Sequence, residues 1–303
     1  MSAAPASRLQ LVLAYTAIYL LWGGSYLAIR WAVTAVPPAI AMGPRNLIGG
    51  IVLIACALAW RTRPLTRMQF GGSIAIGLLY FALSHGLLAT AQRHVPTGVA
   101  ALLFAAVPLW ITLFDSILRR RIPRWPTLLG LVTGFAGIAV LMHGRGGGSG
   151  AVDPLWGLMT LASGMVWATG TVVAVRTLPG SNPVRAAAVQ LIVGGAGLTL
   201  FAAVSGDLRG FTLDQVTLRA GIGFAYLLLA GTFVSFVAFN WLMAREPATR
   251  VATYAFVNPA VAVLIGWAVE GEALNTLILV AMLMIIGAVA LIVLERREPR
   301  AAG

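Results

Sequence analysis

Residues 273–294, ALNTLILVAMLMIIGAVALIVL, form an apolar segment that contains no charged side chain. A helix rises 1.5 Å per residue, so about 20 residues cross the hydrocarbon core of a bilayer. The apolar run is continuous and does not alternate with polar residues, which favours a helix over a strand. The segment therefore predicts a transmembrane helix near the end of the printed sequence.

Nine further apolar segments of similar length precede it. Hydrophobic residues make up 59% of the 303 residues and charged residues only 10%, whereas a soluble domain has about 25% charged residues. This composition predicts an all-α membrane protein with a lipid bilayer as its solvent. The ten predicted transmembrane helices are residues 9–29, 39–60, 70–90, 95–118, 125–142, 155–175, 184–204, 220–243, 251–269 and 273–294.

The basic residues are all arginine and lie in short clusters between the apolar segments. Nucleic-acid-binding proteins gather such residues on one exposed face, so we exclude a nucleic-acid partner despite the net charge of +12. If the N-terminus is cytoplasmic, the inner side holds 15 arginines and the outer side 5, with Arg45 inside the second span. The positive-inside rule therefore predicts that both termini are cytoplasmic.

The sequence repeats itself. A shift of 145 aligns the first two spans with the sixth and seventh, and beyond the next loop the shift becomes 151. A run of matches in constant register indicates a duplicated unit. The matched residues are Trp22 with Trp167, Pro38 with Pro183, Gly49–Gly50 with Gly194–Gly195, Ser84 with Ser235, Pro96 with Pro247, and Pro108 with Pro259.

Each half has five spans, an odd number, so the halves must enter the membrane in opposite orientations. Inverted repeats are typical of secondary transporters. We therefore predict two inverted five-helix repeats, at residues 1–143 and 155–294, joined by a Gly-rich linker at 144–154 and followed by a cytoplasmic tail at 295–303.

The segment Trp22-Gly23-Gly24-Ser25 resembles the W-G-S/T signature of the EamA family of the drug/metabolite transporter superfamily. Gly271-Glu272, with Pro259 before it and Gly287 after it, resembles the end of the family's repeat. Arg121 is a departure, because it takes the usual acidic position in the first half. The resemblance covers nearly the whole chain as two repeats. It implies a ten-helix bundle with a central path for amino acids or amphipathic compounds, often moved outward.

Polar and aromatic residues within the spans are the candidates for substrate binding. Aromatic rings at mid-span, such as Trp22 and Trp167, could stack on a substrate, although helix packing would also explain them. Pro108 and Pro259 are expected to break the fourth and ninth spans at matched positions and to serve gating. The substrate-binding candidates are Trp22, Ser25, Tyr26, Tyr80, His85, Trp110, Trp167, Asn240, Tyr254 and Asn258.

Three charged or titratable groups in the spans have two interpretations each. Arg45 could bind a substrate carboxylate, but we favour a side chain that extends to the outer interface. His85 could carry a proton or could simply hydrogen-bond a neighbouring helix. Tyr80 lies five positions before it, which does not place the two on one α-helical face. Asp115 is expected to pair with Arg119 at the interface.

A secondary transporter is thus the leading hypothesis, with a small-molecule substrate. We expect a monomer in the inner membrane of a bacterium, without cofactor, metal or catalytic residues. The sequence has no lysine, so the phosphate-binding motif of ATPases cannot occur. No span has an acid at its centre, which favours facilitated diffusion, exchange or a histidine relay. An integral membrane enzyme acting on lipid-soluble substrates is the alternative, and a structural or signalling protein is a third.

Overall fold

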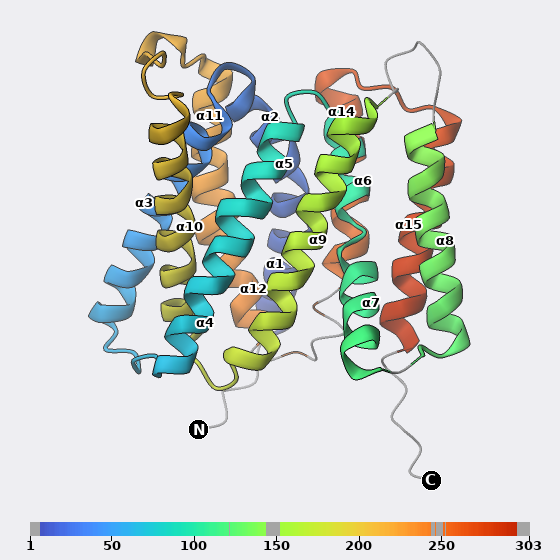
Figure 1. Ribbon diagram of the computed structural model, residues 1–303, viewed down its shortest axis with the longest axis horizontal. Helices are drawn as coiled ribbons and strands as arrows, with labels where there is room; N and C mark the ends of the chain where they lie inside the picture. The colour runs from blue at the N-terminus through green and yellow to red at the C-terminus, as the bar shows by residue number, and fades with distance from the viewer. Residues whose placement is uncertain are drawn as a thin grey trace. The chain divides into compact units, whose positions relative to one another are not determined.

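The computed structural model describes residues 7–120, 122–143, 152–243, 246, 251 and 253–295 (Figure 1). These residues form helices and no strand, as the continuous apolar runs predict. Within them, nine helices are long and apolar enough to cross a membrane, and Tyr254–Glu270 is a shorter apolar helix. The nine are Arg8–Ala35, Pro38–Ala59, Arg67–Ala91, Thr97–Arg119, Trp125–Met142, Pro154–Thr177, Pro183–Ser205, Leu218–Phe239 and Thr276–Val293.

The helices group into two compact units that are not the two halves of the sequence. Unit 1 takes residues 1–27, 95–157 and 230–303, and unit 2 takes 28–94 and 158–229. Each unit therefore combines spans of both predicted repeats. Residues 144–151 of the predicted linker and 296–303 of the predicted tail lie outside the described residues.

Unit 2 is built around the long helices α3 and α10, which lie side by side (Figure 1). Helix α10 also packs against α4 and the π-helix η2 that continues α4. Three elements, α2, α9 and η4, contribute residues to both units. The elements with residues in unit 2 are α2 (Trp22–Ala35), α3 (Pro38–Ala59), α4 (Arg67–Gly77), η2 (Leu78–Ser84), α5 (His85–Ala91), α9 (Pro154–Thr177), α10 (Pro183–Ser205), η3 (Leu213–Gln215), α11 (Leu218–Tyr226) and η4 (Leu227–Ser235).

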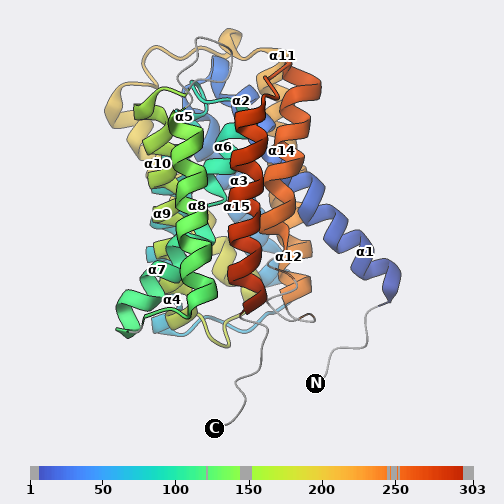
Figure 2. The same ribbon diagram turned by 90° about the vertical axis from the view of Figure 1, so that its right-hand side faces the viewer.

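In unit 1, α15 lies between α8 and α14 (Figure 2). Helix α1 contacts α12, and its N-terminal end points away from α12 and α14. The π-helix η1 joins α1 to α2. The remaining elements of unit 1 are α1 (Arg8–Thr16), η1 (Ala17–Leu21), α6 (Thr97–Phe104), α7 (Val107–Arg119), α8 (Trp125–His143), α12 (Phe236–Met243), α14 (Tyr254–Glu270) and α15 (Thr276–Glu295).

Glycines allow α3 and α10 to approach until their backbones touch. A Cβ placed on Gly43 would lie 3.0 Å from the backbone nitrogen of Thr199, and one on Gly50 would lie 2.8 Å from that of Ile192. Residue numbers rise along α3 as they fall along α10, so the two helices are antiparallel. Lipid tails are as apolar as leucine, so membrane helices associate through close packing of this kind rather than through a hydrophobic effect.

In the α3–α10 contact, each helix places a glycine against the same backbone atom of the other helix. A Cβ on Gly195 would lie 2.6 Å from the backbone nitrogen of Leu47, just as one on Gly50 would meet that of Ile192. Adding 145 converts Gly50 into Gly195 and Leu47 into Ile192, so the repeat shift exchanges the two contacts. The contact thus has a local two-fold symmetry that follows the sequence repeat.

The pair α8–α15 in unit 1 has the same property with the second shift. A Cβ on Gly130 would lie 3.1 Å from the carbonyl oxygen of Ala288, and one on Gly137 would lie 3.3 Å from that of Ala281. Adding 151 converts Gly130 into Ala281 and Gly137 into Ala288, so these contacts also exchange. Each unit therefore contains one antiparallel pair in which matched spans of the two halves meet.

Pro108 and Pro259 affect their helices differently, although they occupy matched positions in the two halves. The fourth span is broken into α6 and α7, with Pro108 in the first turn of α7, where its missing N–H leaves no helical bond unmade. The prediction of a break at Pro259 is wrong, because α14 continues through it. Close packing holds α14 on both sides of the proline: Asn258 lies against Gly23, and Val263 against Gly98.

Two π-helical segments end at the matched serines Ser84 and Ser235. The periodicity of the sequence did not predict these π-helical segments. Ser84 is the last residue of η2, and its Oγ donates to the carbonyl of Ser163 at 2.8 Å. Ser235 is the last residue of η4, and its Oγ donates to the carbonyl of Ala230 at 2.8 Å and approaches that of Ala17 at 3.4 Å. Rare π-helical turns are frequent at functional sites.

Replacing Gly50 with alanine should destabilise the protein, because the new methyl group would collide with backbone atoms of α10 that cannot rotate away. Overpacking of this kind costs about 1–3 kcal/mol. Thermal unfolding of the purified protein in detergent measures the effect, expected as a lower midpoint for Gly50→Ala and for its repeat mate Gly195→Ala.

The matched control is Gly71→Ala in α4, because a Cβ there would meet nothing within 4 Å. Alanine also has the higher helix propensity, so the midpoint should stay constant or rise. Equal losses at Gly50 and Gly71 would contradict the close contact.

Candidate functional site

An aromatic cluster in unit 2 surrounds Trp167 of α9. Tyr80 of η2 stacks on the indole with ring centroids 3.9 Å apart and planes 9° apart. His85 also lies nearly parallel to the indole, at 5.6 Å and 17°, while Phe81 meets both Trp167 and His85 edge-on. Three of the predicted substrate-binding residues therefore form one half-buried aromatic surface.

The π-helix explains why Tyr80 and His85 share a partner. In a π-helix the repeating hydrogen bond spans five residues, so positions five apart come close to alignment. The sequence alone predicts the two residues only as neighbours, because an α-helix separates their faces. The segment Leu78–Ser84 that precedes His85 is π-helical, and both rings reach Trp167.

Hydrogen bonds fix this cluster. The hydroxyls of Tyr80 and Thr171 lie 2.8 Å apart, and the Thr171 hydroxyl also approaches the carbonyl of Trp167 at 3.1 Å. At the end of η2, Ser84 secures the segment to α9 through the carbonyl of Ser163. The Tyr80 ring and the end of η2 are therefore anchored to α9, as a binding surface requires.

Arg45 belongs to the same unit and is buried, with 6% of its surface exposed. Its Nη1 donates to the sulfur of Met42 at 3.9 Å. The preferred interpretation from the sequence, a side chain that extends to the outer interface, is therefore wrong, because the side chain is buried within the protein. The Nδ1 atom of His85 is buried without a hydrogen-bond partner among the residues that the structure describes.

A second aromatic cluster lies in unit 1 around Trp22. The indole meets Phe239 at a centroid distance of 5.2 Å and Tyr254 edge-on at 5.3 Å. Its Nε1 donates to the carbonyl of Gly231 in η4 at 3.1 Å. A carbonyl of a π-helix thus receives a hydrogen bond from a candidate site residue.

Asn258 has a similar partnership. With its amide nitrogen facing the carbonyls, it donates to Ile18 and Tyr19 of η1 at 3.1 Å each. The hydroxyl of Tyr19 lies 2.6 Å from that of Thr253. These bonds tie α14 to η1, and they give the buried Asn258 a structural role in addition to the predicted one.

The other candidates are dispersed within unit 1. Ser25 donates to the carbonyl of Leu21 on its own helix at 2.9 Å. Tyr26 meets Phe104 edge-on at 6.2 Å, and Trp110 meets Phe135 edge-on at 5.0 Å. Helix packing accounts for these contacts. The side chain of Asn240 lies outside the described residues.

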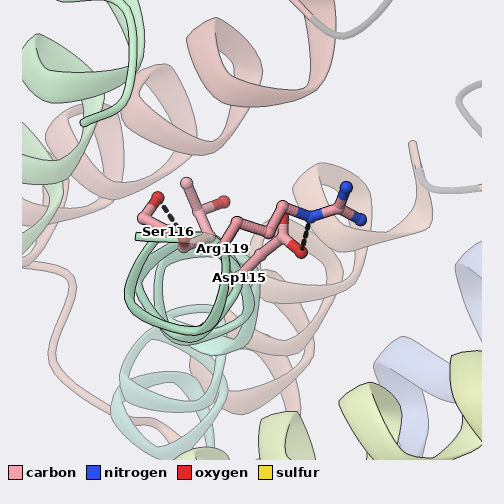
Figure 3. Close-up of polar contacts among 4 residues, drawn as sticks. Asp115, Ser116 and Arg119 are labelled. Atoms are coloured by element: carbon pink, nitrogen blue, oxygen red, sulfur yellow. Dashed lines mark hydrogen bonds and ion pairs between the residues drawn. The ribbon is translucent and has the colours of Figure 1, made fainter. Parts of the chain in front are cut away.

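Asp115 and Arg119 form the ion pair expected from their spacing of four in α7 (Figure 3). The distance from Arg119 Nε to Asp115 Oδ1 is 2.7 Å, and 66% and 45% of the two side chains are exposed. Such exposed pairs contribute at most about 1 kcal/mol. The pair needs no functional explanation.

Glu272 is a residue whose role the sequence interpretation missed. Its two carboxylate oxygens accept hydrogen bonds from the backbone N–H groups of Thr97 at 2.5 Å and Gly98 at 2.9 Å. These are the first N–H groups of α6, which lack partners within the helix. A negative charge there also suits the helix dipole. The Gly-Glu pair of the family signature was the available signal. Arg121, its counterpart in the first half, lies outside the described residues.

Comparison with known proteins identifies the family. Residues 10–143 and 154–294 each match the EamA-like transporter family. The chain belongs to this family. The two matched segments confirm that the chain consists of two EamA repeats, and membership of this family identifies the protein as a membrane transporter.

Relatives of this EamA protein carry transporter names without a stated substrate. "Uncharacterized inner membrane transporter YedA" of Escherichia coli strain K12 is 32% identical over 285 residues, which is 92% of this chain and 89% of the relative. "Uncharacterized transporter YvbV" of Bacillus subtilis is 25% identical, over 98% of this chain and 95% of the relative. A solved structure titled "Crystal structure of protein" has a TM-score of 0.64 at 23% identity, covering 97% and 100% of the two chains, and supports the fold.

Replacing Glu272 with alanine should destabilise the EamA protein, because two backbone donors at the start of α6 would be buried without an acceptor. We expect a loss of about 1–3 kcal/mol, seen as a lower thermal midpoint in detergent, with an intermediate loss for Glu272→Gln.

Asp115→Ala removes a carboxylate from an exposed pair and serves as the control, with a change below about 0.5 kcal/mol. A midpoint as low for Asp115→Ala as for Glu272→Ala would count against the capping role.

Proposed function

We propose that the protein is a secondary transporter that exports small amphipathic metabolites, amino acids among them, by alternating access between two inverted repeats. In this proposal ten helices span the inner membrane, Tyr254–Glu270 included, both termini are cytoplasmic, and a monomer suffices. The inner membrane agrees with the printed name of the relative from Escherichia coli.

The symmetry of the α3–α10 contact is the observation that supports this proposal most. Two antiparallel helices from matching positions of the halves make one contact twice, through Gly50 and through Gly195. If the matched helices cross a bilayer in opposite directions, the halves to which they belong do so as well. The α8–α15 pair supports the same arrangement independently.

Inverted repeats provide a physical basis for alternating access. Each half can adopt the conformation of the other, so exchange of conformations turns an inward-open state into an outward-open state of similar free energy. A substrate that binds the two states with similar affinity does not strongly shift the equilibrium between them, and it can be released on the opposite side.

The unit 2 cluster supports the substrate class. The stacked rings of Trp167 and Tyr80 offer an apolar aromatic surface, which favours substrates with an apolar or planar part. Arg45 supplies a buried positive charge in the same unit, and a guanidinium suits a carboxylate. An amino acid with an apolar side chain has both features. We propose the unit 1 cluster around Trp22 as a second, separate surface for substrate.

The membrane enzyme considered from the sequence is not favoured, because the family and the named relatives are transporters. Within the described ranges, no group of three histidine, cysteine or acidic side chains is placed to hold a metal ion. We therefore propose no reaction for this chain.

Trp167→Ala should reduce saturable uptake of a labelled amino-acid panel into proteoliposomes by about tenfold, because both stacked partners lose their surface. Trp167→Phe should retain part of the activity. Trp125→Ala is the control, since that tryptophan is 74% exposed at the start of α8. Wild-type uptake in Trp167→Ala would exclude the cluster from the site, and absence of uptake for the whole panel in wild type would exclude amino acids as substrates.

A pH gradient distinguishes the two roles of His85. If this side chain carries a proton, an imposed gradient should change wild-type uptake several-fold, and His85→Gln should abolish the dependence of uptake on the gradient. Uptake that is insensitive to the gradient in both proteins would assign His85 to packing.

The orientation is tested with single cysteines in a Cys56→Ala background. Gly210→Cys lies in the loop after α10, and Pro64→Cys in the exposed loop after α3. With cytoplasmic termini, a membrane-impermeant maleimide added to intact cells should label Cys at 210 and not at 64. The reverse pattern would invert the proposed topology.

A further inference from the structure

Five arginines gather at one end of unit 2, where the loop between α3 and α4 lies beside the loop between α9 and α10 (Figure 1). They are Arg61, Arg63, Arg67, Arg176 and Arg185. The structure describes every residue of unit 2, and the unit contains two carboxylates. Both of them, Asp207 and Asp214, follow α10 at the opposite end of that helix. This end of unit 2, the arginine end, therefore carries positive charge that no carboxylate of the unit balances.

Hydrogen bonds join the two loops of the arginine end. The Nε of Arg185 donates to the hydroxyl of Thr62 at 2.8 Å, and that hydroxyl donates to the carbonyl of Ala57 at 2.9 Å. The Nε2 of Gln69 donates to the carbonyl of Pro179 at 3.0 Å. Each loop therefore holds the other, and the arginines of both belong to one surface. Four of them are exposed, and Arg185 is half-buried.

The positions of two of these arginines favour a bound anion. Arg67 is the first residue of α4, and Arg185 lies in the first turn of α10. The N-terminus of a helix carries partial positive charge and is stabilised by negative charge, yet neither first turn contains an acidic residue. A guanidinium group binds phosphate oxygens through paired, charge-assisted hydrogen bonds. A phosphate group would therefore suit both the arginines and the two helix ends.

Exposed apolar side chains beside the arginines indicate which molecule supplies the phosphate. Trp60 is 69% exposed, Met68 60% and Phe70 50%, and all three lie within three residues of Arg61 or Arg67. In membrane proteins, tryptophan is enriched at the level of the lipid head groups. A soluble phosphate compound would leave this apolar surface unused, whereas a phospholipid would cover it with its acyl chains.

We propose that the arginine end of unit 2 is a binding site for an anionic phospholipid. The lipid phosphate lies among the five guanidinium groups, and the acyl chains lie against Trp60 and Phe70. Clusters of arginine at the membrane surface attract anionic lipids, and each basic residue adds to the attraction. The site is separate from the aromatic cluster around Trp167. It depends neither on the proposed transport cycle nor on which face of the membrane this end occupies.

Native mass spectrometry of the purified full-length protein tests the site, because it counts bound lipid molecules and ranks their affinities. The probes are dioleoylphosphatidylglycerol and dioleoylphosphatidylcholine, which have the same acyl chains and differ in the net charge of the head group. We expect wild type to bind its first phosphatidylglycerol about tenfold more tightly than its first phosphatidylcholine.

The double variant Arg63→Gln/Arg67→Gln should reduce this preference to about twofold, because it removes two exposed charges from one loop. Arg176→Gln, from the other loop, should reduce the preference by a smaller factor and provides the test if the double variant does not fold. The matched control is Arg209→Gln, an exposed arginine in the loop after α10 at the opposite end of unit 2, which should keep the wild-type preference.

Three results would overturn the proposal. The first is equal affinity of wild type for the two lipids, and the second is a full preference for phosphatidylglycerol in both arginine variants. The third is binding of glycerophosphoglycerol, the soluble head group without acyl chains, as tightly as the lipid, which would assign the arginine end to a soluble phosphate compound. The titration contains no transport substrate, so its outcome is separable from that of the uptake assay.

Discussion

Close contact between helix backbones is the constraint on which this fold depends. In lipid, a helix gains nothing by hiding apolar side chains from its surroundings, so two helices stay together only if they fit closely. Gly50 and Gly195 provide that fit between α3 and α10, and Gly130 and Gly137 provide it between α8 and α15. The π-helix η2, which carries Tyr80, packs against α10, and α14, which carries Tyr254, packs against α15.

Much of the architecture could be predicted from the sequence because the bilayer imposes simple rules. Length, hydropathy and the scarcity of charges located the nine helices that the described residues show to be long and apolar enough to cross a membrane, and the shift of 145 or 151 located the repeat that the family match confirms. The same shifts exchange the glycine contacts, which could not be predicted because matching positions in sequence do not specify which helices touch. Arg45 shows the same limit, since its position in the second span did not predict that its side chain is buried.

The site was harder to predict because backbone geometry departs from the α-helix where the candidates lie. Tyr80 and His85 share Trp167 only because a π-helix precedes His85, and nothing in the periodicity of the segment indicates that. Glu272 acts on backbone atoms that lie 174 and 175 positions away in sequence. Pro259 failed as a predicted break because α14 packs closely against Gly23 and Gly98 before and after the proline, which compensates for one absent helical bond.

The self-complementary α3–α10 contact has a consequence for how such a chain could arise. An interface related to itself by a two-fold axis does not require two different halves, because two identical chains can make it with each other. A five-helix ancestor inserted into the membrane in both directions would therefore form the same contact as a homodimer. Fusion of two copies would place one half in each direction and would allow the sequence of each half to diverge separately. Such divergence is visible at the repeat position of Glu272, which holds Arg121 in the first half.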